Sequence, residues 1–473
     1  MIKLREYQDD FVNAVREAMR SHKYILGVAP TGAGKTVIFA FVADAVAKKG
    51  KRVIFTVHRQ ELITQTAKTF DDFGIDYGYI CSGMQYDKSK LVHIASIDTL
   101  KNRLELVLQP DLIMIDETHL CMAAGWLKVI QHFADNGAFV WGNTGSPIRL
   151  DGKPLGDVYT TIIEGPTTKW LIDNGHLSQY RYYAPTIPDL SGVKKQMGDY
   201  SKNELETEMS RAKLVGDVVH HYKKLANNTR AVCFCVNIKH SELIAKAFND
   251  AGVNAAHIDG TTPKAERKKI INDFADGKIK VLCNTEIVTT GFDLSAQVGR
   301  DVPIETCILL RPTHSLALYL QMVGRALRKK DYPAVILDHA ACVLKHGLPC
   351  DVRQWSLDGS ENIKSASETE IAAPVICEEC FQAVIKPIPE FCPHCNAVMK
   401  KQKAVIKIIE GELQEIKEAE RLQLKEKLKQ EEREAKTLNE MILVMTKKGS
   451  KNPVHAAKMK MQGRAARQAR FKR

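Results

Sequence analysis

Short apolar segments alternate with amphipathic segments over residues 1–355, and polar or glycine-rich turns separate them. The apolar segments are nearly continuous and five or six residues long, which is typical of strands buried on both faces of a parallel sheet. Two blocks of strands are predicted, at 24–29, 52–57, 91–96, 111–116 and 138–142 and at 231–236, 254–259, 280–285, 306–311 and 334–338. Right-handed crossovers would place the intervening helices on both faces of each sheet. The sequence therefore predicts an α/β fold with two tandem doubly wound parallel-sheet domains, at residues 1–165 and 166–355.

The pattern changes after the second block. Residues 356–375 are polar and rich in serine, which predicts a linker, and a four-cysteine element follows at 376–400. Residues 401–446 are rich in Glu, Lys, Leu and Gln, and their spacing predicts a single exposed C-terminal charged helix. Residues 447–473 form a basic tail that we expect to be disordered when alone.

The net charge of +12 favours a polyanionic partner, and most of it lies in the tail. Residues 447–473 contain six Lys, four Arg and no acid, which leaves +2 for the rest of the chain. No apolar stretch reaches the roughly 18 residues of a spanning helix, and the N-terminus lacks the apolar core of a secretory signal. We therefore expect no membrane partner and a cytoplasmic location. The scattered cysteines fit buried free thiols in a reducing compartment.

A glycine-rich turn lies between the first predicted strand and the first helix after it. Gly32 and Gly34 permit backbone N–H groups to turn towards phosphate, Lys35 supplies a cation and Thr36 a hydroxyl for Mg²⁺. The N-terminus of the helix adds a favourable dipole. A plain glycine-rich turn is the alternative, but the in-frame sequence predicts an ATP site with Mg²⁺ at Thr31-Gly32-Ala33-Gly34-Lys35-Thr36.

An acidic pair ends another predicted strand. Asp116 and Glu117 lie at the carboxyl end of residues 111–116, the edge of an α/β sheet where ligands bind. We predict that Asp116 holds Mg²⁺ and that Glu117 orients the attacking water. A solvated helix N-cap is the alternative, but the phosphate loop upstream favours the catalytic interpretation.

Six segments in order resemble the motifs of superfamily 2 helicases. The resemblance covers about residues 1–345 and implies two RecA-like domains that form an ATP-driven nucleic-acid motor. Gly145 departs from the family's usual alanine. Segments at 165–177 and 310–321 and the four-cysteine element are most similar to the RadD-type bacterial and phage proteins, which implies DNA repair in a bacterial or phage-infected cell. The six segments are Leu4-Arg5-Glu6-Tyr7-Gln8, the phosphate loop, Asp116-Glu117-Thr118-His119, Thr144-Gly145-Ser146-Pro147, Val288-Thr289-Thr290-Gly291-Phe292-Asp293 and Gln321-Met322-Val323-Gly324-Arg325-Ala326-Leu327-Arg328.

The resemblance also implies roles for single residues. Arg325 and Arg328, three apart on a predicted helix, would face the phosphates and act as arginine fingers. Gln8 could instead be an ordinary polar helix residue, and the nucleic-acid candidates could be helix caps. The implied sets are nucleotide contacts at Arg5, Gln8, Gly291 and Asp293, coupling at His119, Thr144, Ser146 and Gln321, and nucleic-acid contacts at Arg59, Thr99 and Thr285.

Cys377, Cys380, Cys392 and Cys395 form two Cys-x-x-Cys pairs separated by eleven residues. Two such turns can bring four thiolates onto one Zn²⁺, and metal would stabilise a segment too short for a core. Two disulfides or two redox pairs are the alternatives. His394 lies inside the second turn and is not predicted as a ligand. The phenylalanines at 381 and 391 are expected to pack on the turns, with stacking on bases left open.

Taken together, these patterns and the resemblance predict an ATP-dependent DNA helicase or translocase in repair, recombination or replication. An RNA helicase and a non-catalytic DNA-binding adaptor are the alternatives. The intact Lys35, Asp116, Glu117, Arg325 and Arg328 argue against the adaptor. The expected cofactors are ATP, Mg²⁺ and Zn²⁺, and the expected partner is single-stranded or branched DNA, with RNA as the other candidate.

Overall fold

The computed structural model describes most of residues 3–399 and a few positions beyond them. The described ranges are 3–58, 60–120, 122–149, 153–184, 193, 195–196, 199–210, 212–285, 294–358, 374–377, 379–384 and 388–399. Residues 1–400 form one compact unit and 401–473 another. In the second unit the described residues are Thr437, Glu440, Met441, Val444, Met445, Ala457 and Met461.

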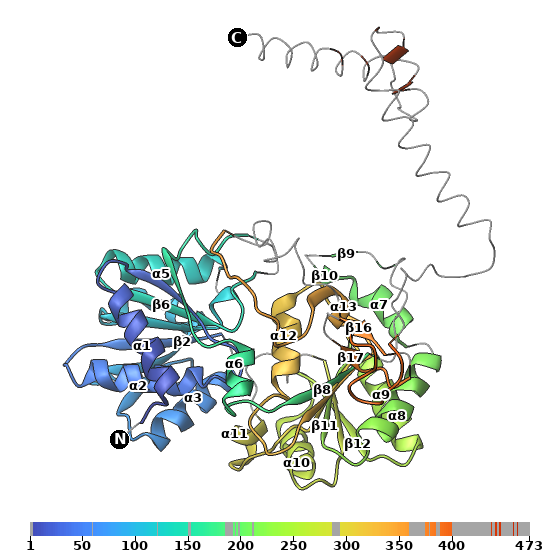
Figure 1. Cartoon of the computed structure of the whole chain (residues 1–473). Helices are drawn as coiled ribbons and strands as arrows, with labels where there is room; N and C mark the ends of the chain where they lie inside the picture. Colours follow the sequence, from blue (N-terminus) through green and yellow to red (C-terminus); the bar gives the residue numbers. More distant parts are fainter. Residues whose placement is uncertain are drawn as a thin grey trace. The chain divides into compact units, whose positions relative to one another are not determined.

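The first sheet has seven strands in the order β3-β4-β2-β5-β6-β1-β7, and every neighbouring pair is parallel (Figure 1). Parallel pairing brings the carboxyl ends of its strands to one edge, where the phosphate loop and the acidic pair follow β1 and end β5. The strands are β1 (Tyr24–Val28), β2 (Val53–Val57), β3 (Tyr77–Ile80), β4 (Val92–Ser96), β5 (Leu112–Asp116), β6 (Phe139–Thr144) and β7 (Thr161–Glu164).

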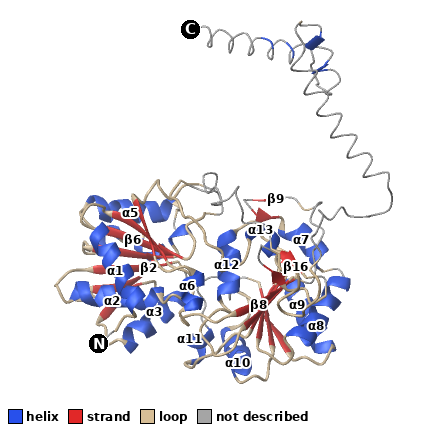
Figure 2. Ribbon diagram, viewed as in Figure 1, coloured by secondary structure: helices blue, strands red, loops and turns tan. Residues whose placement is uncertain are grey.

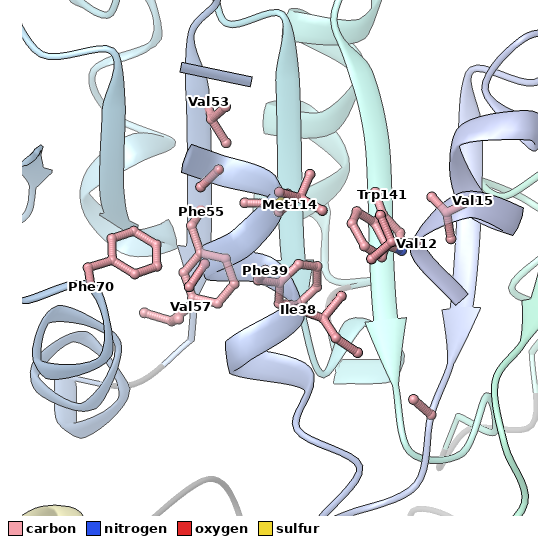
Figure 3. Close-up of a cluster of buried hydrophobic side chains, with 14 of the residues drawn as sticks. Val12, Val15, Ile38, Phe39, Val53, Phe55, Val57, Phe70, Met114 and Trp141 are labelled. Carbon is pink, nitrogen blue, oxygen red and sulfur yellow. The ribbon is translucent and has the colours of Figure 1, made fainter. Parts of the chain in front are cut away.

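Apolar side chains cover both faces of this sheet. On β5, Met114 belongs to the core on one face and Ile113 to the core on the other, which is the alternation of a fully buried strand. Helices α1, α2 and α3 cover the first face, where Phe39 and Phe55 meet at 5.1 Å between ring centroids (Figure 3). Helix α5 covers the second. The elements are α1 (Glu6–Ala18), α2 (Lys35–Ala47), α3 (Gln60–Asp72), α4 (Ile97–Leu100), α5 (Ala124–Asp135), α6 (Thr168–Asp173), η1 (Leu104–Leu106) and η2 (Thr118–Leu120).

The second sheet has six strands, also all parallel, in the order β12-β13-β11-β14-β15-β8. Figure 2 labels its edge strand β8 and shows strands in red and helices in blue. On β11, Val232 and Cys233 again face two different cores. Helices α10 to α13 cover one face, and α7 to α9 cover the other. The elements are β8 (Tyr180–Tyr183), β11 (Ala231–Phe234), β12 (Ala255–Ile258), β13 (Val281–Asn284), β14 (Thr306–Leu309), β15 (Ala334–Asp338), α7 (Lys202–Met209), α8 (Ala212–Leu225), α9 (Ile238–Asp250), α10 (Lys264–Ala275), α11 (Leu294–Val298), α12 (Leu316–Gly324) and α13 (Cys342–His346).

The predicted fold class of two tandem doubly wound parallel sheets is confirmed. All ten predicted strands are present, with bounds that shift by a few residues. The sequence analysis missed three strands, β3, β7 and β8, each at an edge of its sheet. Two small hairpins were also missed: β9 (Lys195–Gln196) with β10 (Asp199–Tyr200), and β16 (Val375–Ile376) with β17 (Ala383–Val384).

Within the described residues, two segments of the chain connect the two sheet domains. The first connection contains α6 and leads into β8. The second follows α13, where Arg353 donates hydrogen bonds to the carbonyl oxygens of His346 (3.0 Å) and Leu348 (2.9 Å) in the second domain. The chain then returns to the first domain, where the Gly156 amide donates to the Leu357 carbonyl at 2.9 Å and Trp355 packs on the core beneath. Residues 353–357, which we predicted as the end of the second domain and the start of a linker, therefore cross from the second domain to the first.

The C-terminal unit corrects one expectation. Ala457 is helical and buried, and it packs with Met441, Val444 and Met445. Part of the tail that we expected to be disordered therefore packs against residues N-terminal to it. Most of the charged helix predicted for 401–446 and most of the tail lie outside the described residues. Within the described part of the chain, no helix has the length and apolar character needed to cross a membrane.

Candidate active site and metal centre

The phosphate loop is held open by two glycines in the left-handed region. Gly32 has φ +89° and Gly34 has φ +84°, and Gly34 directly precedes α2. A Cβ at Gly34 would lie 2.5 Å from Nε2 of Gln8, and one at Gly32 would lie 2.7 Å from the Leu177 side chain. Only glycine fits these two positions without strain or displacement. The loop therefore presents backbone rather than side chains to a ligand, as a phosphate cradle requires.

Lys35 and the acidic pair lie together at the carboxyl edge of the first sheet. Nζ of Lys35 lies 3.7 Å from Oε1 of Glu117 and donates to the Ala29 carbonyl at 3.3 Å. Glu117 has φ +47°, an uncommon conformation for a non-glycine residue, and its amide donates to Oδ1 of Asp116 at 3.0 Å. This turn places two carboxylates and one ammonium group in a small, largely buried volume.

Burial and the neighbouring charges separate the two carboxyl groups. Burial, followed by the charge of Glu117, raises the pKa of Asp116 to about 7. Burial is the largest single influence and opposes ionisation of Glu117, but Lys35, followed by His119, His58 and Arg325, together outweigh it and hold the pKa of Glu117 below its ordinary value. Glu117 is therefore ionised at neutral pH, and Asp116 is the carboxyl group that a cation would ionise on binding.

A chain of hydrogen bonds leads from the acidic pair to the loop after β6. Oγ1 of Thr144 donates to the Ser146 carbonyl at 3.0 Å, so it accepts from Nδ1 of His119 at 2.8 Å. That bond assigns the proton to Nδ1, which also lies 3.4 Å from Oε2 of Glu117. Burial lowers the pKa of His119, so the imidazole is neutral. Three of the four residues assigned to coupling thus form one connected group that begins beside Glu117.

Gln8 and Arg5 lie at the other side of the phosphate loop. The Gln8 amide is buried, accepts from the Arg5 backbone at 3.0 Å and donates to the Ala33 carbonyl at 3.0 Å. Gln8 therefore forms the capping box of α1 and also contacts the loop, and its amide retains one N–H and one lone pair for a base. Arg5 is exposed beside Gln8.

The second domain contributes residues that face this edge. Arg325 is buried and Gln321 lines a cavity of about 720 Å³, part of it open to solvent, together with Pro30, Thr31 and Ser146. A Cβ at Gly324 would lie 2.8 Å from Cβ of Thr31, so the end of α12 approaches the phosphate loop as closely as a glycine allows. The site is therefore assembled from both domains.

The prediction that Arg325 and Arg328 share a helical face is wrong. Helix α12 ends at Gly324, Arg325 caps it, and Arg328 pairs with Leu177 in an isolated antiparallel bridge. The hydroxyl of Ser178 donates to the Arg328 carbonyl at 2.8 Å. The first connection between the domains therefore fixes the Arg328 backbone, which no local sequence signal indicated.

The nucleic-acid candidates are less well defined. Thr99 is buried on α4, and Thr285 follows β13 directly, so they lie in different domains. Arg59, Gly291 and Asp293 lie outside the described residues.

The four cysteines converge as predicted. Their Sγ atoms all lie within 4.8 Å of one another, and the pairs Cys377–Cys395 and Cys380–Cys392 are both separated by 3.7 Å. Four thiolates arranged tetrahedrally at about 2.3 Å from zinc are about 3.8 Å apart, whereas a disulfide requires about 2 Å. The four thiols are free, so the two-disulfide alternative does not describe this structure.

The two turns that carry the cysteines repeat one local structure. The residue after each second cysteine has a left-handed φ, +61° at both Phe381 and Asn396. The Phe381 amide donates to the Cys377 carbonyl at 2.8 Å, and the Asn396 amide donates to the Cys392 carbonyl at 2.8 Å. This repeated turn aims two thiols at one point from each side. Phe391 stays exposed, and Phe381 contacts His221 of the second domain, so the expectation that both rings pack on the turns is not met for Phe391.

Sequence reasoning missed several residues that shape the site. Tyr7 donates to the Ala33 carbonyl at 3.1 Å and contacts the rings of Trp170 and His176. Thr118 and Tyr159 share a buried hydrogen bond beneath the acidic pair. The resemblance could have directed attention to Tyr7, which lies inside the quoted motif, but the other contacts join residues distant in sequence.

Comparisons with known proteins agree with this geometry. Residues 1–149 match the family described as type III restriction enzyme, res subunit, and residues 212–330 match the helicase conserved C-terminal domain. A 51.5 kDa protein of Lactococcus phage (isolate 7-9) is 33% identical over 400 residues, which cover 84% of this chain and 83% of the phage protein. A Saccharomyces cerevisiae protein that carries the name of an ATP-dependent helicase, IRC3, is 30% identical over 359 residues. That match covers 70% of this chain and 51% of the yeast protein, so the chain spans about half of this relative.

Among solved structures, the ATP-dependent type ISP restriction-modification enzyme LlaBIII bound to DNA has a TM-score of 0.51 and 17% identity. The match covers 71% of this chain and 27% of the LlaBIII chain. This likeness shows a shared fold. The two matched ranges contain most strands of the two parallel sheets. Thr31 of the phosphate loop and Gln321 line one cavity, and the charge of Arg325 acts on Glu117. The chain belongs to the superfamily 2 helicases of the type III restriction enzyme kind, ATP-hydrolysing enzymes that act on nucleic acid.

Proposed function

We propose that this helicase is a DNA-dependent motor in which the residues around Lys35 bind and hydrolyse ATP. The observation that carries the proposal is the group of Lys35, Asp116, Glu117 and Arg325, which two domains assemble beside an open glycine-rich loop. Lys35 would hold the β- and γ-phosphates, and Glu117, kept ionised, would orient the attacking water. Arg325 and Arg328 would stabilise the charge that develops during transfer.

Mg²⁺ fits the donors on this edge. Thr36 supplies a hydroxyl and Asp116 a carboxylate, both oxygen ligands that Mg²⁺ prefers. Bound there, the ion would neutralise phosphate charge and lower the pKa of Asp116. His119, Thr144 and Ser146 would transmit the state of Glu117 to the loop that faces the second domain.

DNA is the polymer we propose, because several relatives bear the names of DNA enzymes. A Sulfurisphaera tokodaii protein named DNA 3'-5' translocase XPB2 is 25% identical over 386 residues. An Escherichia coli ATP-dependent RNA helicase, SrmB, is 22% identical over 329 residues, which keeps RNA as the second candidate. The phage relative supports a role in the cytoplasm of a bacterial or phage-infected cell, and we propose repair, recombination or replication as the process.

Zinc is the metal we propose for the four cysteines. The Sγ separations of 3.7 Å suit tetrahedral thiolate coordination, and the repeated turns bring the thiols together without a disulfide. The proposed zinc is structural, because four protein ligands leave no open position for substrate.

ATP hydrolysis measured with single-stranded DNA, duplex DNA and RNA tests the polymer and the site together. We expect DNA to stimulate turnover of the unmodified protein, and we expect Lys35→Ala to abolish that turnover. Lys48→Ala, an exposed change at the C-cap of the same helix, is the matched control and should behave like the unmodified protein. If RNA alone stimulates turnover, RNA is the polymer on which the motor acts. Near-normal turnover in Lys35→Ala would overturn the assignment of the ATP site.

A further inference from the structure

One edge of the second sheet is formed by β8, a strand of four residues that pairs only with β15 among the named strands of that sheet. Its free side would present unpaired backbone groups, which are unfavourable unless water or another segment satisfies them. The strand begins beside a contact with a proposed catalytic residue, because the Ser178 hydroxyl, just before β8, donates to the Arg328 carbonyl. What covers β8 therefore bears on the position of Arg328.

The four-cysteine element covers the carboxyl end of this strand. Tyr183 and Gln382 form an antiparallel bridge, and the Ala184 amide donates to the Phe381 carbonyl at 3.0 Å. Gln382 in turn accepts from the Cys377 amide at 3.0 Å, so the backbone that pairs with β8 is the backbone of the first metal-binding turn.

Side chains join the same two parts of the fold. The Tyr183 hydroxyl and Nε2 of His394 are hydrogen-bonded at 3.1 Å, with His394 between the cysteines of the second turn. The Phe381 ring lies 5.7 Å from that of His221 on α8. Ile376 packs against the core of the second domain. Each turn therefore contacts the second domain independently of the other.

We propose that the four-cysteine element completes the second motor sheet, and that metal bound to its thiolates holds the element, and so the end of β8, in place. This inference rests on the proposed zinc site. The element has strands of two residues each and a small apolar cluster, too little to be stable alone, so its order depends on the metal. His394, which does not act as a ligand, is a positioning residue that links the second turn to Tyr183.

Hydrogen exchange of the full-length protein, followed by mass spectrometry, tests the role of the metal. We expect chelation to speed exchange in the peptide covering 180–184 by about tenfold, because the hydrogen bond from Ala184 to Phe381 breaks. The peptide covering β3, an edge strand of the first sheet whose named strand partner is β4, is the internal control and should not change. Metal content is measured in the same samples.

Two variants of β8 separate the effect of the Tyr183–His394 contact from the effect of metal binding. Tyr183→Phe removes only the hydroxyl that meets His394, and we expect exchange at 180–184 to rise a few-fold while the metal content stays unchanged. His394→Gln, which keeps a hydrogen-bonding group, should restore part of the protection that His394→Ala removes. Tyr180→Phe is the matched control, because its hydroxyl contacts Cys350 at 2.9 Å instead of the element.

The outcomes distinguish the two proposals. If the native protein contains no metal, both the zinc site and the role of the metal at β8 are overturned. The comparison of Tyr183→Phe with Tyr180→Phe then still decides whether the four-cysteine element covers β8. Bound metal with unchanged exchange after chelation overturns the role of the metal at β8 alone. Equal exchange in Tyr183→Phe and Tyr180→Phe overturns the contact.

Discussion

Two glycines near the phosphate loop differ in how much space surrounds them. At Gly324 a Cβ would lie 2.8 Å from Cβ of Thr31, closer than real carbon atoms approach. At Gly145 the nearest neighbours, including Nζ of Lys35, would be 3.7 Å away, an ordinary contact. Position 145 therefore has room for the alanine that the family resemblance implies there, whereas a side chain at position 324 would displace α12 or Thr31.

We predict that Gly324→Ala lowers the turnover number for ATP by about 10²-fold, because a displacement of about 1 Å misplaces Arg325. Gly145→Ala is the matched control and should keep nearly full turnover. Steady-state ATP hydrolysis with saturating DNA measures both, and thermal unfolding checks that each variant folds. Similar activity in the two variants would contradict the close packing of α12 on the loop.

We predict that Arg328→Ala reduces turnover by about 10³-fold and changes ATP affinity little, because its charge is needed mainly in the transition state. Nucleotide binding and turnover are measured separately. The exposed neighbour Lys329, changed to alanine, controls for the removal of one positive charge. Weakened affinity at unchanged turnover would instead make Arg328 a ground-state ligand.

The placement of the proposed site residues was largely predictable from sequence because their motifs are local. Gly32, Gly34 and Lys35 act within one turn, and Asp116 follows directly from the strand that carries it. The contacts of Ser178 with Arg328 could not be read, because they join residues 150 positions apart. The helical pairing of Arg325 with Arg328 failed because α12 stops at Gly324, where the chain turns to meet the first connection.

At the scale of elements, the central strands and the edge strand β12 were predicted, whereas the edge strands β3, β7 and β8 were missed. A central strand such as β5 is apolar along its length because two cores cover it. The edge strand β8 reads Tyr180-Arg181-Tyr182-Tyr183, and β7 has no fully buried residue. Both depend on the neighbour they pair with, so their own sequences carry a weak signal.

The four-cysteine element gives the prediction at this scale. We predict about one zinc ion per chain in the purified protein, and its absence from the double variant Cys377→Ser/Cys395→Ser, which removes one ligand from each turn. Cys350→Ser, outside the element, is the control and should retain the metal. Elemental analysis decides the stoichiometry, and a full complement of zinc in the double variant would refute the site.

At the scale of the whole molecule, the basic tail concerns affinity for nucleic acid. Residues 447–473 carry ten positive charges and no negative ones. Because Ala457 packs on Met441 and Met445, deleting the tail would also uncover apolar residues. Neutralising Lys458, Lys460, Arg464, Arg467 and Arg470 to Gln is the cleaner test, since it keeps Ala457 and Met461.

We predict that this neutralised variant binds DNA more weakly and with a flatter dependence on salt. Each phosphate that the variant no longer neutralises should reduce the slope of log affinity against log salt by about 0.7 on single strands and about 0.9 on duplex. Basal ATP hydrolysis should persist, because the described residues of the nucleotide site and of the cavity beside it all precede residue 447. Equal slopes for the two proteins would show that the tail does not touch DNA.

The two connections between the sheet domains have a mechanical consequence. Two domains joined by one flexible segment can rotate relative to each other about any axis. Here Ser178 fixes one crossing beside Arg328, and Arg353 with Leu357 fixes the other. Two anchored crossings permit the domains to open about one axis and resist rotation about the other axes. Energy released at Lys35 and Glu117 would therefore drive motion along one path.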